Sequence, residues 1–558
     1  MVNFNDYKYK RLDFEETKDK INSLIDSFIG SNNESECISY FKSIIDIQNE
    51  IEELADYADI RNMRDGSDEF FAKEMDYWNE TKNQFDVLFN PFYKAVLNHK
   101  YLESLKSKAP ENFFNTIEYQ LRITSEDIIE LQKRDNELKK AYRDIIRTKI
   151  NYNGEEINLS SFSKYFDSEN PEVRKSAHNA YNDYFYSHLS ELDNIISELV
   201  EVRNKIAVTC GFKDYSEYSI YKLRRFGYDY KDIKVFREGI IKYFLPLCES
   251  LRELQKRNLG VDELHYYDTI FFKDSIQLKY HGEYLVNKFI EVFYKIDKSL
   301  GQFFEESVKN NYIDLLARKD KVGFAVTNYL SKMGVPVITC NYKDTIYDVN
   351  VTLHEMGHGY QKLNASDSDK SYVVSSLLKY PTFDVCEMFS YGMQLIGLDY
   401  VDDLFDSDNL EKYKYSFYKD IITSLPYMAL VDEFQETIYK ENLSGESIRQ
   451  KWLELAKKYE QDINNSGHIN LDSGGYFYRQ SHIFIDPFYY IDYAISYFGA
   501  IAIYSKCQSG LETFNNAARV ASYYPLKSIL DMYSIPNPFD EESIKSMSEM
   551  LQKKLNLK

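Results

Sequence analysis

One short segment, residues 349–361, constrains the fold most because it places two histidines at helical spacing. It reads VNVTLHEMGHGYQ. On a helix, His354 and His358 share one face, where their neutral imidazoles can bind one Zn²⁺ and leave room for a third ligand and a water. Glu355 then lies about 100° around the helix from His354, beside the metal-bound water rather than on the metal. The segment therefore predicts a helix that carries part of a metal site.

The alternative for this segment is a surface helix with two incidental histidines, since nine histidines are present in the chain. Its surroundings favour the metal site. Val349, Val351 and Leu353 make the approach to the motif apolar, and a strand-like run lies just upstream. We therefore interpret the segment as a metal-binding helix.

A third ligand is expected on a neighbouring helix, and the segment at 380–394 supplies candidates. It reads YPTFDVCEMFSYGMQ and contains Asp384 and Glu387, one helical turn apart. Either carboxylate can bind the metal while the other supports it or caps the helix. Composition alone leaves this choice open.

A third cluster, YFYRQSHIFIDPFYYIDYAISYFGA, contains Arg479, His482, Tyr489, Tyr490 and Tyr493. Its aromatic residues are typical of a buried seam, which is our interpretation of Tyr489. His482, Tyr490 and Tyr493 can instead donate hydrogen bonds to a carbonyl oxygen that becomes anionic during attack. With Arg479, they are the candidate substrate-binding residues.

Hydrophobic periodicity predicts a mostly α protein with a small sheet near the middle of the sequence. We expect an N-terminal helical region at 1–147 and a catalytic region at 148–558. The elements expected are helices at 13–28, 36–63, 125–147, 171–211, 229–257 and 283–301, a hairpin at 149–159, and strands at 323–330 and 335–342.

Charge and cysteine usage exclude several classes of protein. The net charge is −21 and no basic block is present, which excludes a nucleic-acid partner. Six scattered cysteines form no CxxC pair, which argues against a disulfide framework or a thiolate metal site. The N-terminus has no apolar segment of a signal peptide, and the apolar stretch at 494–504 is too short to span a membrane. We expect a cytoplasmic protein with no membrane partner.

Together, HEMGHGYQ, YPTFDVCEMFSYGMQ and HIFIDPFYYIDY resemble the thimet oligopeptidase and oligoendopeptidase F family of zinc peptidases. Their order and spacing also match. The helical N-terminal third, with YADIRNMRD at 57–65, is similar to the oligoendopeptidase branch. The likeness implies a fold of two mostly helical lobes, a clamshell around a deep central channel that admits unstructured peptides, with the small sheet beside the metal-binding helix.

The resemblance also implies roles for individual residues. It implies one zinc ion per chain, with His354, His358 and Glu387 as ligands, so that Glu387 is chosen over Asp384. Glu355 is implied as the general base. The resemblance further implies that three residues contact substrate and help stabilise the oxyanion: His482, Tyr490 and Tyr493.

Two positions depart from the family pattern. Phe389 stands where the branch usually has histidine, and Gln394 where it usually has glutamate. Since Gln394 follows Glu387 by two helical turns, it shares that face and is expected to support the ligands without binding the metal. The lost negative charge affects metal affinity and pH optimum but not the ligand set.

We therefore expect an endopeptidase that hydrolyses short peptides as a monomer or weak homo-oligomer. The strand at 335–342 is expected to align the substrate backbone by β-pairing along its edge. Two alternatives are a zinc carboxypeptidase of similar helical fold and a helical scaffold that has lost activity. Cleavage of an internally blocked peptide distinguishes endopeptidase from exopeptidase action.

Overall fold

A computed structural model describes residues 3–269, 271, 276–366, 377–378, 380–460, 463–507 and 510–557. The described chain is mostly helical with two small sheets, as the sequence predicts. It divides into two compact units, each assembled from three segments of the chain. Unit 1 comprises Met1–Leu121, Ile276–Glu411 and Ser496–Pro536, and unit 2 comprises Arg122–Ser275, Lys412–Ile495 and Asn537–Lys558. The division of the sequence at 147 and 148 stays a prediction.

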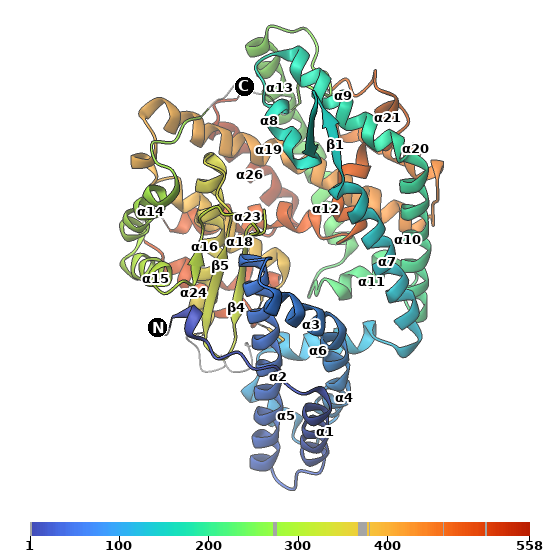
Figure 1. Ribbon diagram of the computed structural model, residues 1–558, viewed down its shortest axis with the longest axis vertical. Coiled ribbons are helices and arrows are strands. Elements are labelled where there is room, and N and C mark those ends of the chain that lie inside the picture. Colours follow the sequence, from blue (N-terminus) through green and yellow to red (C-terminus); the bar gives the residue numbers. More distant parts are fainter. Residues whose placement is uncertain are drawn as a thin grey trace. The chain divides into compact units, whose positions relative to one another are not determined.

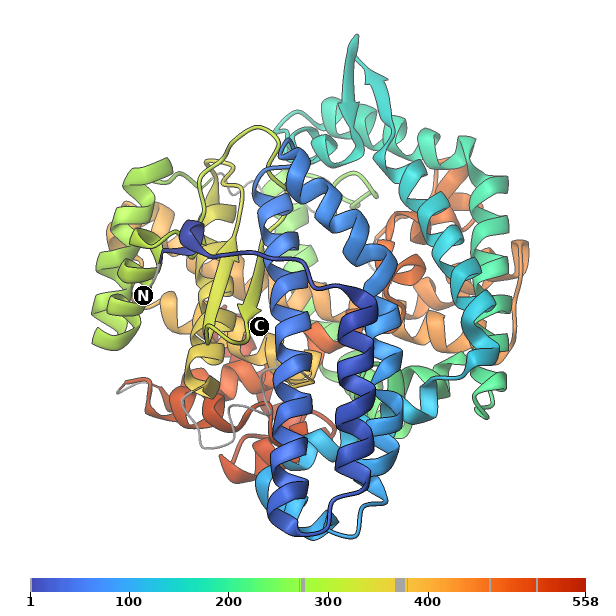
Figure 2. The same cartoon turned by 60° about the horizontal axis from the view of Figure 1, so that its bottom comes forward.

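Unit 1 begins with a helical layer whose long members α1 and α2 lie side by side (Figure 2). Its N-terminal helices are α1 (Phe14–Ile29), α2 (Glu34–Arg64), α3 (Glu69–Leu88), α4 (Asn90–Leu97), α5 (Leu102–Lys108) and α6 (Glu111–Ile123). Asp13 and Asn33 cap α1 and α2 by accepting amide hydrogen bonds from Glu16 and Glu36. One apolar core joins these helices to the sheet of the same unit through Leu330 and Val337.

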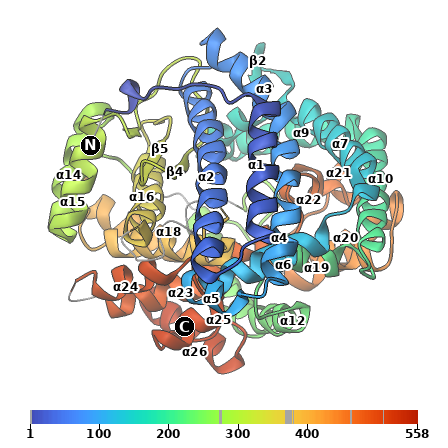
Figure 3. The same ribbon diagram turned by 90° about the horizontal axis from the view of Figure 1, so that it is seen from below.

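Unit 1 contains further helices. They are α14 (Gly282–Ile296), α15 (Lys298–Lys309), α16 (Ile346–Ser366), α18 (Phe383–Gly397), α24 (Glu512–Val520) and α25 (Leu526–Met532), and α23 (Tyr490–Lys506) contributes residues to both units. Helices α14 and α15 form an adjacent pair (Figure 3). The single predicted helix at 283–301 is wrong, because Asp297 leaves the helical conformation and caps α15 by accepting from the amides of Ser299 and Leu300.

The sheet of unit 1 has the order β3–β5–β4, formed by β3 (Ile313–Asp314), β5 (Val335–Thr339) and β4 (Val326–Leu330). β5 is antiparallel to β4 and parallel to β3, and α16 packs beside β4 and β5 (Figure 1). The small sheet beside the HEMGH helix is therefore confirmed. The prediction that 335–342 offers a free edge is wrong for β5, which is the central strand, and the edge strands are the two-residue β3 and the longer β4.

Unit 2 contains a hairpin and a further set of helices. These are β1 (Lys149–Tyr152), β2 (Glu155–Asn158), α7 (Ile129–Arg147), α8 (Ser163–Phe166), α9 (Pro171–Ser187), α10 (Leu189–Thr209), α11 (Tyr215–Lys222), α12 (Tyr230–Gly239), α13 (Leu245–Leu259), α19 (Ser407–Lys440, which begins in unit 1), α20 (Glu446–Tyr459), α21 (Ile469–Asp472), α22 (Ser481–Phe484) and α26 (Glu541–Lys554). Asn153 and Gly154 turn the hairpin with positive φ, as their sequence predicts.

The long helix predicted from Pro171 to Gly211 is divided in two at His188. There the imidazole Nδ1 lies 3.0 Å from the Tyr184 carbonyl oxygen, and the amide of His188 bonds to Phe185 instead. The side chain therefore competes for the carbonyl that would continue the helix. The predicted end at Gly211 is confirmed, since this glycine has φ +86° directly after α10.

Among the described residues, no helix is both long and apolar enough to cross a membrane.

Candidate active site

Helix α16 carries the two histidines of the motif on one face in unit 1. The rings of His354 and His358 are 4.9 Å apart and nearly perpendicular. Two residues of the apolar approach, Val349 and Leu353, are fully buried. Asp348 closes the turn before the motif by accepting the amides of Lys343 and Asp344. The local sequence therefore fixes both the start of the helix and its orientation.

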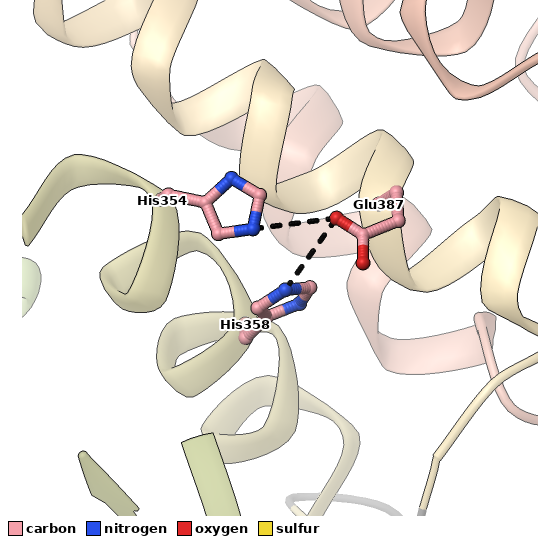
Figure 4. Close-up of side chains that lie close together, drawn as sticks. All are labelled: His354, His358 and Glu387. Atoms are coloured by element: carbon pink, nitrogen blue, oxygen red, sulfur yellow. Dashed lines mark ion pairs between the residues drawn. The ribbon is translucent and has the colours of Figure 1, made fainter. Parts of the chain in front are cut away.

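Glu387 on α18 points toward both histidines (Figure 4). Its Oε2 lies 3.3 Å from Nε2 of His354 and 3.7 Å from Nε2 of His358. Potential ligand atoms of these three side chains all lie within 4.8 Å of one another. Asp384, the alternative carboxylate, is buried one turn earlier and is not a member of this group, and its Oδ1 accepts the amide of Val385. The geometry favours Glu387, and its role as a ligand stays a prediction.

A glycine inside the motif lets α16 and α18 approach this closely. A Cβ built on Gly357 would lie 2.5 Å from the carbonyl oxygen of Phe389 and 2.5 Å from Cα of Ser390. Both obstacles are backbone atoms of α18, so neither can move aside as a flexible side chain would. Gly357 is therefore required by the contact between helices and not by a turn.

The charge balance of the three side chains fits a bound cation. Burial alone would raise the pKa of Glu387, but the two histidines lower it to about 2. Burial would lower the pKa of His354, but the Glu387 carboxylate raises it to about 9, whereas burial lowers that of His358 to about 4. A proton on His354 thus balances the buried carboxylate, and a metal ion binds where it can displace such a proton.

Two polar residues hold the motif side chains in place. Nδ1 of His354 is 3.1 Å from Oε1 of Gln394, so the prediction that Gln394 faces the ligands agrees with its position. The hydroxyl of Thr327, on β4, donates to Oε2 of Glu355 at 2.6 Å. Burial raises the pKa of Glu355. Thr327 was not singled out from the sequence, because its contact with Glu355 depends on how the sheet packs against α16.

The second departure, Phe389, and another supporting residue, Ser390, also lie on α18. The hydroxyl of Ser390 donates to Oε2 of Glu387 at 2.9 Å. The two residues are three positions apart on one helix, a spacing from which this contact could have been predicted. Phe389 is fully buried and packs edge-on against Phe514, with ring centroids 5.1 Å apart. Phe389 therefore contributes to the apolar core behind the ligands.

The third cluster lies in unit 2 and forms a group of half-buried polar rings. The centroid of the His482 ring is 4.7 Å from that of Tyr490 and 6.1 Å from that of Tyr493, and the two tyrosine rings are 6.0 Å apart. Nε2 of Gln480 lies 2.7 Å from Nδ1 of His482, and burial lowers the pKa of that histidine. The lowered pKa favours the neutral ring, whose hydrogen lies on Nε2 when Gln480 donates to Nδ1.

Two buried arginines anchor the backbone of this segment. Arg203 donates to the carbonyl oxygens of Ile483 and Phe484. Arg225 donates to the carbonyl oxygen of Phe488 at 2.6 Å, and Phe488 has φ +70°, an unusual conformation for an aromatic residue. These contacts are nonlocal and were not predicted. They hold the main chain that presents the half-buried rings.

Comparison with known proteins gives the class of protein to which this chain belongs. A model of peptidase family M3 matches residues 164–523, and a model of the peptidase M3 N-terminal domain matches residues 4–124. These matches cover most of the sequence. The chain belongs to peptidase family M3.

Individual relatives identify the branch. Oligopeptidase PepF of Bacillus subtilis (strain 168) is 23% identical over 433 residues, which are 72% of this chain and 61% of that protein. The oligoendopeptidase F homolog of Lactococcus lactis subsp. lactis (strain IL1403) is 21% identical over 365 residues, 64% of this chain and 58% of that protein. The chain matches about three fifths of the length of these curated relatives.

Solved structures match over almost the whole chain. A structure of PZ peptidase A with an inhibitor has a TM-score of 0.90 and 26% identity, and covers 99% of both chains. A 3.1 Å X-ray structure of a candidate oligoendopeptidase F has the same TM-score and identity and covers 100% of this chain and 99% of its own. The predicted resemblance to the oligoendopeptidase F branch is confirmed.

Proposed function

We propose that this chain is a zinc-dependent endopeptidase that hydrolyses internal bonds of short, unstructured peptides. The observation that carries the proposal is the convergence of His354, His358 and Glu387 at the motif that also contains Glu355. Membership of peptidase family M3 supports peptide hydrolysis, and the names of the relatives support oligopeptides as substrates.

The three converging side chains supply two imidazole nitrogens and a carboxylate oxygen, a donor set that suits one zinc ion and leaves a position for water. When bound, zinc lowers the pKa of such a water to about 7 and polarises the substrate carbonyl. Gln394 orients the ring of His354 by accepting from Nδ1, which directs Nε2 toward the ion.

Glu355 is proposed as the general base. Thr327 fixes its carboxylate by donating to Oε2, so that Oε1 accepts the proton of the attacking water. The same carboxyl then delivers the proton to the leaving amine. Burial raises its pKa, which makes the carboxyl a better match for both steps.

Three side chains of the C-terminal segment are proposed to supply donors for the carbonyl oxygen as it becomes anionic. Tyr493 and Tyr490 present hydroxyl groups, and His482 presents Nε2–H. Arg479, in the same segment, is proposed to contact the substrate. The backbone of the peptide is proposed to pair with β4, since this strand lies at the edge of its sheet.

Digestion of a mixed peptide library tests the proposal directly. Peptides of about 5–20 residues are expected to be cut at internal bonds, including peptides blocked at both ends, and a chelator is expected to abolish cleavage. Products are identified by mass spectrometry, and zinc is measured in the same sample by elemental analysis. Release of single C-terminal residues would favour the carboxypeptidase, and full activity in metal-free protein would exclude the zinc mechanism.

A further inference from the structure

Arg479 is a cation without a matching carboxylate in the part of unit 2 that the structure describes. Its guanidinium carbon lies 3.8 Å from the centroid of the Tyr476 ring, and Nη2 donates to the hydroxyl of the same tyrosine. No ion pair joins it to a carboxylate within the described residues. Since a guanidinium has five donors in a planar fork, one tyrosine hydroxyl leaves most of its hydrogen-bonding capacity for another group.

The buried arginines of the same unit show how unusual this is. Each donates to an aspartate at 2.6–2.8 Å, and the pairs are Arg174–Asp268, Arg203–Asp135, Arg225–Asp492 and Arg237–Asp432. Pairing of this kind offsets the cost of removing a charge from water. Arg479 is half-buried and has no such pair with any carboxylate that the structure describes, so this position offers a partly desolvated positive charge that a ligand can neutralise.

The nearby charges do not cancel that of Arg479. Glu460 interacts with it through space, but the two form no ion pair, and burial raises the pKa of Glu460. Arg252 also acts on Glu460, so this carboxyl is shared between two cations. Glu460 is therefore not a dedicated partner of Arg479.

A series of neighbouring tyrosine rings also connects Arg479 to the rings proposed to contact substrate. Tyr476 lies 6.2 Å from Tyr427, and Tyr427 lies 6.1 Å from Tyr490, measured between ring centroids. The hydroxyl of Tyr427 also donates to Oε1 of Gln480, the residue that bonds to His482. These side chains are half-buried and reachable from solvent. The path from Arg479 to Tyr490 corresponds to at most about five residues of extended peptide.

We propose that Arg479 binds a carboxylate group of the peptide substrate, with Tyr476 holding the guanidinium flat for a bidentate contact. The proposal rests on the peptidase function proposed above. The carboxylate has two possible sources, the C-terminus of a short peptide and the side chain of an aspartate or glutamate. Peptides that end near the rings would supply the first and longer peptides the second.

Matched peptides separate these sources. One pair has the same sequence with a C-terminal carboxylate or amide, and a second series carries one Glu or Gln moved along the sequence of an amidated peptide. Each is assayed with the zinc-loaded wild type and with R479Q, R479K and R122Q. Arg122 is the matched control because its guanidinium also lies over a tyrosine, 4.4 Å from Tyr221, and donates to that hydroxyl at 2.7 Å, but it is exposed.

In the wild type and R122Q, at least one carboxylate peptide should have a KM about 10- to 100-fold lower than its neutral match. R479Q should reduce that ratio to about one, and R479K should keep part of it. An equal KM for every pair in the wild type, an unchanged ratio in R479Q, or an equal loss on neutral and acidic peptides would each overturn the proposal.

Calorimetry distinguishes failure of this site from failure of the proposed function. The same peptide pairs are titrated into the full-length wild type and R479Q, with thermal unfolding to check that the variant is folded. Stronger binding of the carboxylate peptide by the wild type alone supports the site even if no peptide is cleaved. Equal binding of both peptides by both proteins contradicts it even if cleavage is efficient.

Discussion

Nδ1 of His354 on α16 lies 3.1 Å from Oε1 of Gln394 on α18. Because an amide oxygen accepts hydrogen bonds, this contact places a hydrogen of the imidazole on Nδ1 and leaves Nε2, which lies 3.3 Å from Oε2 of Glu387, as the proposed ligand atom. The amide performs this task without a negative charge. The contact with the ring and the charge at this position can therefore be varied separately.

Replacing Gln394 separates these two effects. Gln394→Leu should weaken zinc binding about 10- to 100-fold, since the ring of His354 loses its acceptor. Gln394→Glu should bind zinc at least as tightly as the wild type, since the added charge makes the imidazole a stronger ligand. Competition with a fluorescent chelator measures both, and unchanged affinity in Gln394→Leu would show that the contact has no part in binding.

The choice between two carboxylates can be tested through metal content. Glu387→Gln should lose zinc on dialysis, because it removes the charge that lies 3.3 Å from His354 Nε2. Asp384→Asn, one turn away, should retain about one zinc per chain. Elemental analysis of both variants after dialysis decides the matter, and the reverse pattern would assign the ligand to Asp384.

For the base, Glu355→Gln removes the proton acceptor and keeps the shape of the side chain. Zinc content and thermal unfolding should match the wild type, while kcat falls by about 10² or more. Stopped-time assays with an internally quenched peptide provide the measurement. A variant that turns over at the wild-type rate would show that another group accepts the proton.

Tyr493→Phe deletes a single hydroxyl proposed to stabilise the oxyanion. Since this bond strengthens only as charge develops, kcat should fall about 10²- to 10³-fold with KM nearly unchanged. Tyr489 is the matched control, because its ring lies 5.0 Å from that of Tyr493 and its proposed role is packing. Equal kinetics for Tyr493→Phe and the wild type would leave the task to Tyr490 and His482.

A buried histidine away from the site should make stability depend on pH. His178 stacks on Phe166 with ring centroids 3.9 Å apart, and burial lowers its pKa to about 3, with Arg479 and Arg174 acting in the same direction. An unfolded histidine has a pKa of about 6.5, so between these values only the unfolded chain binds the proton. Stability contributed by the neutral ring is therefore complete above pH 6.5 and is lost as pH falls.

By pH 5 this loss amounts to about 2 kcal/mol. His178→Phe keeps an aromatic ring on Phe166 and removes the titrating group. Its free energy of unfolding, measured in urea, should therefore fall by about 2 kcal/mol less between pH 7.5 and pH 5 than that of the wild type. Parallel pH profiles for the two proteins would contradict the assignment.

The parts of the site that could be predicted from the sequence are those that depend on the spacing of residues within one helix. His354 and His358 share a face because four residues make about one helical turn. Gln394 shares the face of Glu387 because seven residues make about two turns, and both side chains therefore reach His354. Thr327 was missed because its contact with Glu355 joins a strand to a helix 28 residues later. Spacing within a segment contains no information about such pairings.

The same limit explains the errors in the fold. Periodicity predicted a strand at 335–342 but not its neighbours, so β5 was expected at an edge and lies in the centre. Likewise, the break at His188 depends on a side chain bonding to the Tyr184 carbonyl, a choice that the apolar pattern on either side does not show. The main-chain contacts of Arg203 and Arg225 could not be predicted, because each arginine donates there to a main-chain carbonyl, a group that every residue has.

The contact at Gly357 has a consequence for protein design. Grafting His354, His358 and Glu387 onto two helices of another scaffold would reproduce all three side chains and still leave their nitrogen and oxygen atoms too far apart, unless the first helix has no side chain where it meets the second. A design of this site therefore has to specify one position without a side chain as well as the three residues that converge. The missing side chain of one glycine therefore determines how closely the two helices can approach.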